Sequence, residues 1–193
     1  MPLTIGEDVF YDANGNVIAS TAAPGRIEVP LSDMAPDLRH AFIAIEDSRF
    51  YQHPGLDPVG IARAFIRNIR AGRIVEGGST ITQQLAKNMY LSSKRTFGRK
   101  LAEAVLALYL EVRFSKDEIL ERYLNLVYLG HGAYGVEAGA RLYFGKQASD
   151  LTLAEASTLA GITRAPFYYS PYRDMDAAAR RRKTVLDRML AID

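Results

Sequence analysis

Three helix-start signals of one kind mark the middle and the C-terminal part of the chain. In each, a serine or threonine is followed three residues later by a glutamine or glutamate. The pairs are Thr80 with Gln83, Ser115 with Glu118 and Thr152 with Glu155. Such a pair forms a capping box, in which each side chain bonds the backbone N–H of the other residue. We therefore expect a helix to begin at each pair, in a mainly α-helical single domain.

Apolar spacing predicts two further helices. Apolar residues at positions 38, 41, 42 and 45 repeat as one buried helical face, and that helix brings Glu46 and Asp47 to its end. A second helix is predicted from about Thr96 to Val112. Its inward face is predicted to consist of Leu101, Ala104, Val105, Leu108 and Val112.

The segment after Asp57-Pro58 is predicted to form an amphipathic helix. Its apolar stripe is Ala62, Phe65, Ile66 and Ile69, and its basic stripe is Arg63, Arg67 and Arg70. A helix packed on the core shows such a stripe. A helix lying on an anionic membrane surface shows it too. The sequence leaves both interpretations open.

Residues 1–30 read as an N-terminal arm or linker, and residues 31–193 as the folded domain. Apolar residues 9–11 and 16–18 flank an Asn14-Gly15 turn signal, which predicts a short β-hairpin. A further short strand is predicted over residues 26–29.

Composition excludes some kinds of site. The chain has no cysteine, so it forms no disulfide and no cysteine–zinc site. Its three histidines do not follow a zinc-ligand spacing, and we expect no histidine-held metal. No run approaches the ~20 apolar residues that a membrane span needs. We therefore expect any membrane anchor to lie outside this chain.

The run Glu46-Asp47 stands at the end of an apolar helix, just before a His53-Pro54-Gly55 break. Loops on a rigid support often carry catalytic groups. A carboxylate at this place can take a proton from a sugar hydroxyl. The alternative interpretation is a solvated acidic helix end, since carboxylates are mostly exposed surface groups.

Residues 77–88 combine glycines with a helix start, hydroxyls and amides. A helix N-terminus presents free N–H groups and the positive end of the helix dipole, which favour an anion. Lys87 adds a positive charge two turns later. The alternative is an ordinary capped helix after a loop.

Arg99, Lys100 and Glu103 share one helical face through i, i+3 and i, i+4 spacing. Two cations beside a carboxylate suit a phosphate, or a metal bridging to one. A surface ion pair worth ~0.3–0.5 kcal/mol is the alternative. Residues 116–125 and 164–171 read as structural, with Arg164 the one group in the second segment that can face a ligand.

Taken together and in this order, these five segments resemble the peptidoglycan glycosyltransferase family. That family comprises the transglycosylase module of class A penicillin-binding proteins and the monofunctional peptidoglycan glycosyltransferases. The most specific stretch is residues 78–88, Gly-Ser-Thr-Ile-Thr-Gln-Gln-Leu-Ala-Lys-Asn. The resemblance implies a lysozyme-like helical lobe beside a smaller, membrane-facing lobe. It also implies that lipid II is polymerised into β-1,4-linked glycan, with inversion and release of undecaprenyl diphosphate.

The resemblance also implies roles for individual residues. Glu46 matches the general base, and Glu103 matches a second catalytic carboxylate that is also the candidate ligand of a divalent metal ion, Mg²⁺ or Mn²⁺. The matching substrate-binding positions are Asp47, Phe50, Ser79, Gln83, Lys87, Asn88, Arg95, Arg99, Lys100 and Arg164. Asp47 and Phe50 match supporting positions, and Lys87, Arg95, Arg99 and Lys100 match cations around the donor diphosphate.

The implied partners are lipid II, the growing glycan strand and the membrane surface. A transpeptidase domain or other cell-wall synthesis proteins are further implied partners, and no nucleic acid is expected. The implied location is the outer, periplasmic face of the bacterial cytoplasmic membrane. A lysozyme-like enzyme that cleaves glycan is one alternative, and a non-catalytic module that binds lipid II or glycan is another. Penicillin binding is not expected, because the motif set of a transpeptidase is missing from this sequence.

Overall fold

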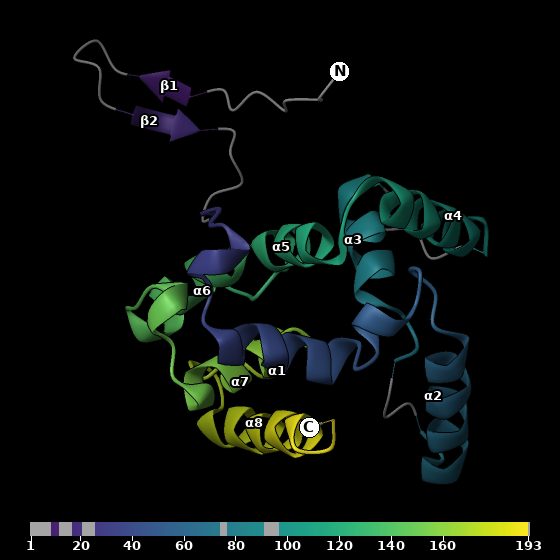
Figure 1. Cartoon of the computed structure of the whole chain (residues 1–193). Helices are drawn as coiled ribbons and strands as arrows, with labels where there is room; N and C mark the ends of the chain where they lie inside the picture. The colour runs from purple at the N-terminus through teal and green to yellow at the C-terminus, as the bar shows by residue number, and fades with distance from the viewer. Residues whose placement is uncertain (1–8, 12–16, 21–25, 74–76, 91–96, 193) are drawn as a thin grey trace.

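The structure is a computed structural model of the chain, and it describes residues 9–11, 17–20, 26–73, 77–90 and 97–192 (Figure 1). These residues form two strands, β1 (Val9–Tyr11) and β2 (Val17–Ser20), and three 3-10 helices, η1 (Leu31–Asp33), η2 (Phe50–Gln52) and η3 (Ala148–Asp150). The α-helices are α1 (Pro36–Glu46), α2 (Pro58–Ala71), α3 (Ile81–Tyr90), α4 (Phe97–Arg113), α5 (Lys116–Leu126), α6 (Val136–Phe144), α7 (Leu153–Ile162) and α8 (Met175–Met189). The predicted mainly α-helical fold class is confirmed.

In the N-terminal segment, β1 and β2 pair antiparallel and lie apart from the helices (Figure 1). The predicted Asn14-Gly15 turn lies outside the described residues. The short strand predicted over residues 26–29 does not form, since only Arg26 makes a bridge, with Tyr134. The backbone N–H and carbonyl of Val29 instead bond the side chain of Asn125, at 3.0 and 2.8 Å.

The centre of the helical body is α7, which packs against α1 and α8. Residues 156–162 are all buried, as expected for a helix with apolar or small residues on every side. The predicted inner face of α1 is confirmed, with Leu38, Ala41 and Phe42 fully buried and Ile45 partly buried against the core. This packing fixes the C-terminal end of α1, where Glu46 lies, against the C-terminal end of α7.

All three predicted capping boxes are present. In each of α5 and α7 the hydroxyl of the N-cap residue and the carboxylate three residues later bond each other's backbone N–H groups. At α3 the Gln83 N–H donates to Thr80 Oγ1, and the Thr80 N–H donates to Gln83 Oε1, both over 3.1 Å. Local side-chain chemistry therefore sets these three helix starts.

The predicted inward face of α4 is wrong. Leu101, Val105, Leu108 and Val112 are 69%, 59%, 43% and 85% exposed. The buried side of the helix carries Glu103, Ala107 and Leu110, which recur at i, i+4 and i+7. This side packs against α3 and α5. Most of the large apolar residues of α4 thus face outward, and the buried side carries a carboxylate.

The apolar stripe of α2 is also exposed. Phe65 is 65% exposed and Ile69 63%, while the buried positions are the small residues Gly60 and Ala64. The core-packed interpretation of this stripe is therefore wrong. Figure 1 shows α2 and α4 on the same side of the molecule, at the right of the view. Within the described residues, no helix combines the length and the apolar character that crossing a membrane requires.

Candidate active site

A cavity of about 310 Å³ lies where α1 ends, beside α3, α4 and the segment after α7. Its lining residues are Ile45, Glu46, Gly77, Ser79, Gln83, Gln84, Lys87, Glu103, Thr163, Arg164 and Arg181. Six of the predicted site residues are therefore brought to one place by the fold, namely Glu46, Ser79, Gln83, Lys87, Glu103 and Arg164. Segments far apart in the sequence meet here.

The Glu46 carboxylate is held by two neutral donors. Gln84 Nε2 donates to Glu46 Oε2 over 2.9 Å, and Thr163 Oγ1 lies 2.7 Å from Glu46 Oε1. Each oxygen has a defined neighbour, so the carboxylate plane is fixed. Neutral donors hold a carboxylate in place without neutralising it, as a group that must accept a proton requires.

Gln84 is oriented in turn by a buried tyrosine. The Tyr123 hydroxyl lies 3.4 Å from Gln84 Oε1, and Tyr123 is fully buried. Burial, with smaller contributions from the nearby Glu46 and Asp47 carboxylates, raises the pKa of Tyr123 well above its usual value. The phenol therefore keeps its proton and donates it to the amide oxygen. The amide nitrogen then points toward Glu46.

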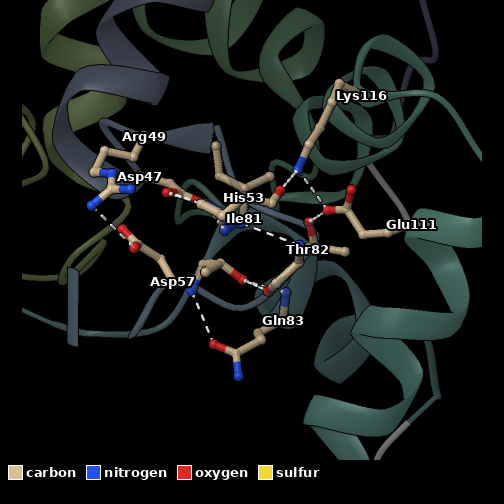
Figure 2. Close-up of polar contacts among 11 residues, drawn as sticks. Asp47, Arg49, His53, Asp57, Ile81, Thr82, Gln83, Glu111 and Lys116 are labelled. Atoms are coloured by element: carbon tan, nitrogen blue, oxygen red, sulfur yellow. Dashed lines mark hydrogen bonds and ion pairs between the residues drawn. The ribbon is translucent and has the colours of Figure 1, made fainter. Parts of the chain in front are cut away.

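Asp47, the next residue after Glu46, belongs to a buried polar network that reaches the start of α3 (Figure 2). Asp47 accepts from the Ile81 backbone N–H over 3.0 Å, and His53 Nε2 lies 3.0 and 3.1 Å from its two carboxylate oxygens. The Gly55 N–H donates to His53 Nδ1 over 3.2 Å, so Nδ1 accepts and the Nε2 proton faces Asp47. Burial raises the pKa of the Asp47 carboxyl, while the hydrogen bond from His53 opposes that rise.

The same network extends to α4 and α5 (Figure 2). Glu111 Oε1 accepts from Thr82 Oγ1 over 2.6 Å and from Lys116 Nζ over 2.8 Å. Lys116 also donates to the His53 carbonyl over 2.6 Å. Because every link is a defined bond between different elements, the end of α1 is tied to the beginnings of α3 and α5.

On α4, Glu103 is paired with two cations. Arg99 Nη1 lies 2.8 Å from Glu103 Oε1, and Lys100 Nζ lies 2.8 Å from Glu103 Oε2. Lys100 also donates to Ser79 Oγ over 2.9 Å, which links α4 to the loop before α3. The Glu103 side chain is 4% exposed and that of Lys100 is 50% exposed. The lysine charge is therefore open to a ligand, while the carboxylate holds it in place.

Two further cations border the cavity, one from the segment after α7 and one from α8. Arg164, predicted from the sequence, and Arg181 of α8, which was not predicted, both border the cavity. Arg181 Nε donates to the Gly161 carbonyl over 3.3 Å. Burial and the neighbouring Arg164 lower the pKa of Arg181, and Glu46 partly opposes this. A Cβ at Gly161 would come within 3.0 Å of Arg181 Cγ, so the glycine lets α8 approach here.

The remaining predicted residues have other surroundings. Phe50 is fully buried, with Lys116 Nζ 4.5 Å from its ring centre, so it packs in the core and does not border the cavity. Asp47 borders a second, smaller hollow that Glu46 also borders. Asn88 is exposed on α3 and borders neither hollow. Arg95 lies outside the described residues.

Three cavity residues with polar side chains were not predicted from the sequence. Gln84 was detectable, because it precedes Lys87 by three residues and so shares its side of α3. Thr163 stands next to the predicted Arg164, but nothing local shows that its hydroxyl meets Glu46. Arg181 lies in a run of four basic residues, and the sequence does not show which of them points inward.

The donor set near Glu103 does not favour a divalent metal by itself. Mg²⁺ is usually bound by one or two carboxylates together with substrate phosphates. Glu103 supplies one carboxylate, and both of its oxygens already face cations. One group of potential ligands in the described residues is Asp47, His53 and Asp57. There the His53 and Asp47 atoms already bond each other.

A fixed carboxylate and a cluster of cations around one cavity suit an enzyme that transfers a sugar from a phosphate leaving group. Catalysis then needs a base for the incoming hydroxyl and positive charge for the departing anion. The fold and the site together are consistent with a mainly helical glycosyl-transferring domain.

Comparison with known proteins identifies the family. The model of the family described as Transglycosylase matches residues 14–190. Penicillin-binding protein 1A of Aquifex aeolicus is 50% identical over 180 residues, which is 93% of this chain and 25% of that protein. Penicillin-binding protein 1A of Escherichia coli is 51% identical over 181 residues, covering 94% of this chain and 21% of that protein. A crystal structure of penicillin-binding protein 1A from Haemophilus influenzae matches 95% of this chain and 18% of its own, at 25% identity and a TM-score of 0.48.

The chain belongs to the transglycosylase family, and the predicted resemblance to the peptidoglycan glycosyltransferase part of class A penicillin-binding proteins is confirmed. It spans about a quarter or less of the length of these two curated relatives.

Proposed function

We propose that this domain polymerises lipid II into β-1,4-linked glycan strands, with Glu46 as the general base. The observation that carries the proposal is that Glu46 and Glu103 line one cavity, and that Glu103 holds Arg99 and Lys100 beside it. A base for the attacking hydroxyl and cations for the leaving diphosphate are thereby available to one bound pair of substrates.

The proposed reaction is a single displacement. The 4-hydroxyl of the acceptor sugar attacks C1 of the donor, and its proton passes to Glu46. The bond from C1 to the diphosphate oxygen breaks as the new glycosidic bond forms. Because the hydroxyl enters opposite the leaving group, the configuration at C1 inverts.

Positive charge stabilises the departing undecaprenyl diphosphate in this scheme. A diphosphate leaves as an anion and needs charge neutralisation more than it needs a proton, so preorganised cations lower the barrier. Lys87, Arg99 and Lys100 are the described cations on the side of α3 and α4, and Arg95 belongs to the same proposed set. Since both oxygens of Glu103 already face cations, no step is assigned to a metal ion.

Contact with a membrane surface is part of the proposal. The large hydrophobic side chains described as exposed on α2 and α4 are Val59, Ile61, Phe65, Ile66, Ile69, Leu101, Val105, Leu108, Tyr109 and Val112. Exposed arginines follow on α2 at positions 67 and 70. Apolar side chains beside arginines suit an anionic bilayer surface, where each basic residue is worth about 1 kcal/mol. We propose that α2 and α4 form the membrane-facing lobe, on the periplasmic side, where lipid II presents its sugars.

Two other functions predict different products. A glycan-cleaving enzyme has no need for the cations around Glu103, because its substrate carries no diphosphate. A binding module has no need for a carboxylate fixed by two donors. Glu46 and Glu103 both line the cavity, and Arg99 and Lys100 pair with Glu103. This combination supports synthesis over cleavage or binding alone.

The test is incubation of the purified domain with labelled lipid II in detergent, with Mg²⁺ or with a chelator, followed by gel separation. We expect a ladder of polymer from the wild type and none from Glu46→Gln. Finished glycan strands are incubated in parallel. Fragments from those strands, or bound lipid II without any polymer, would contradict the proposal. Loss of the ladder in the chelator alone would show that a metal must be added to the scheme.

A further inference from the structure

Thr163 is the C-cap residue of α7, and its hydroxyl stands between two oxygen atoms. Thr163 Oγ1 lies 2.7 Å from Glu46 Oε1 and 2.7 Å from the carbonyl oxygen of Ala160. A hydroxyl has one proton to donate and two lone pairs that accept. An ionised Glu46 and a carbonyl are both acceptors, so Thr163 serves only one of them fully at a time.

The protonation state of Glu46 decides which neighbour receives that proton. Hydrogen bonds to an ionised acceptor are roughly twice as strong as neutral ones. While Glu46 is ionised, the Thr163 proton therefore points to Glu46 Oε1. Once Glu46 carries a proton, its own O–H donates to Thr163 Oγ1, and the Thr163 proton turns toward the Ala160 carbonyl.

We propose that Thr163 is a positioning residue for Glu46 that keeps the carboxyl bonded in both of its protonation states by turning its hydroxyl. The inference rests on the proposed function, in which Glu46 takes the proton of the acceptor hydroxyl. No covalent bond changes at Thr163. The hydroxyl rotates about its own C–O bond, and the carboxyl group stays in place.

The arrangement of the other donor explains why Thr163 is needed. Gln84 Nε2 can only donate, and its amide is held by the Tyr123 hydroxyl. Gln84 therefore bonds Glu46 Oε2 in the ionised state and offers nothing to a proton on the carboxyl. Within the described surroundings of Glu46, the Thr163 hydroxyl is a group that can both donate to the base and accept from it.

The chain supplies a matched control on the same helix. Thr158 Oγ1 donates to the Ala154 carbonyl over 2.7 Å, and Thr158 is 9% exposed. Replacing Thr158 by valine removes the same kind of hydroxyl-to-carbonyl bond but no contact with a carboxylate. It separates the effect on Glu46 from a general effect on α7.

The experiment compares Thr163→Val, Thr163→Ser, Thr158→Val, Glu46→Gln and wild type by steady-state lipid II polymerisation and thermal unfolding. For Thr163→Val we expect kcat to fall roughly 10- to 100-fold, which corresponds to the loss of one hydrogen bond to a charged group. The KM should stay within about 2-fold of the wild-type value. Thr163→Ser should recover kcat to within about 3-fold of wild type, since it keeps the hydroxyl. Thr158→Val should unfold at a temperature similar to Thr163→Val and keep wild-type kcat.

Wild-type kcat in Thr163→Val would overturn the inference, and so would a serine variant as slow as the valine variant. An equal fall of kcat in Thr158→Val would overturn it too. Each of these outcomes leaves the proposed function standing if Glu46→Gln is inactive. A wild-type domain that makes no polymer would overturn the proposed function itself.

Discussion

Glu46 and Glu103 line one cavity but have different bonding partners. Two neutral side chains bond the Glu46 carboxylate, whereas two cations lie 2.8 Å from the oxygens of Glu103. A carboxylate with neutral donors remains able to accept a proton, and a carboxylate between cations serves to hold them. In the proposed reaction these environments suit different tasks for the two acids, although both side chains are the same.

Replacing Glu46 by glutamine should remove the base and keep the shape. We expect the polymerisation rate to fall by roughly 10²- to 10⁴-fold, the usual contribution of a general base, with lipid II affinity nearly unchanged. Gel analysis of product and a binding titration measure the two quantities. Asp187→Asn on α8, whose carboxylate pairs with Lys183 at the surface, is the control and should keep full activity. Near-normal strand synthesis by Glu46→Gln would refute the base assignment.

Removing a cation next to Glu103 should lower the catalytic efficiency with the donor substrate. We expect Arg99→Ala and Lys100→Ala each to lower kcat/KM at least about 10-fold, because charge opposite the diphosphate is lost. Lys183→Ala removes a lysine from a surface ion pair and serves as the matched control. If turnover and lipid II affinity are unchanged in both variants, the cations do not bind the diphosphate.

The two sides of α4 should respond differently to truncation. Leu110 is 1% exposed, and we expect Leu110→Ala to lower the free energy of unfolding by about 2–5 kcal/mol. Leu101 is 69% exposed, and Leu101→Ala should change it by less than about 0.5 kcal/mol. Urea unfolding measures both values. On anionic vesicles, Leu101→Ser combined with Val105→Ser should bind less than wild type, and equal binding would contradict a membrane role for this face.

The start of α7 should contribute a stability that is lost in acid. The hydrogen bond from Lys146, followed by the bond from the Thr152 backbone N–H, lowers the pKa of Glu155 below 4.5. Glu155 therefore takes up its proton at a lower pH in the folded chain than in the unfolded chain. Its contribution to the free energy of unfolding is complete above pH 4.5 and is lost as the pH falls through the lowered pKa.

Glu155→Gln should therefore lower the free energy of unfolding by about 0.5 kcal/mol at pH 7, as expected for a partly exposed pair, and by less at about pH 3. Urea unfolding at both pH values measures the difference. Lys146→Met, which removes the cation but leaves Glu155 to titrate, should show a smaller dependence on pH than wild type. A cost of Glu155→Gln that is the same at both pH values would contradict the assignment.

Sequence reasoning worked best for features that depend on neighbouring residues. Capping boxes act over three residues, and the apolar spacing of α1 acts within one helix, so both were predicted correctly. It failed on α4, which has large apolar residues on one side and Ala107 and Leu110 on another. Periodicity favoured the larger set, while packing against α3 and α5 buried the smaller one.

By itself, the sequence determined where most helices begin, the family, and which acids and bases are candidates for chemistry, because these depend on residue type and spacing. Only the tertiary structure decided that Gln84 and Thr163 meet Glu46, that Arg181 turns into the cavity and that the apolar side of α4 faces outward. Those contacts join residues from separate helices. Their geometry follows from how α1, α3, α7 and α8 pack, which no local pattern encodes.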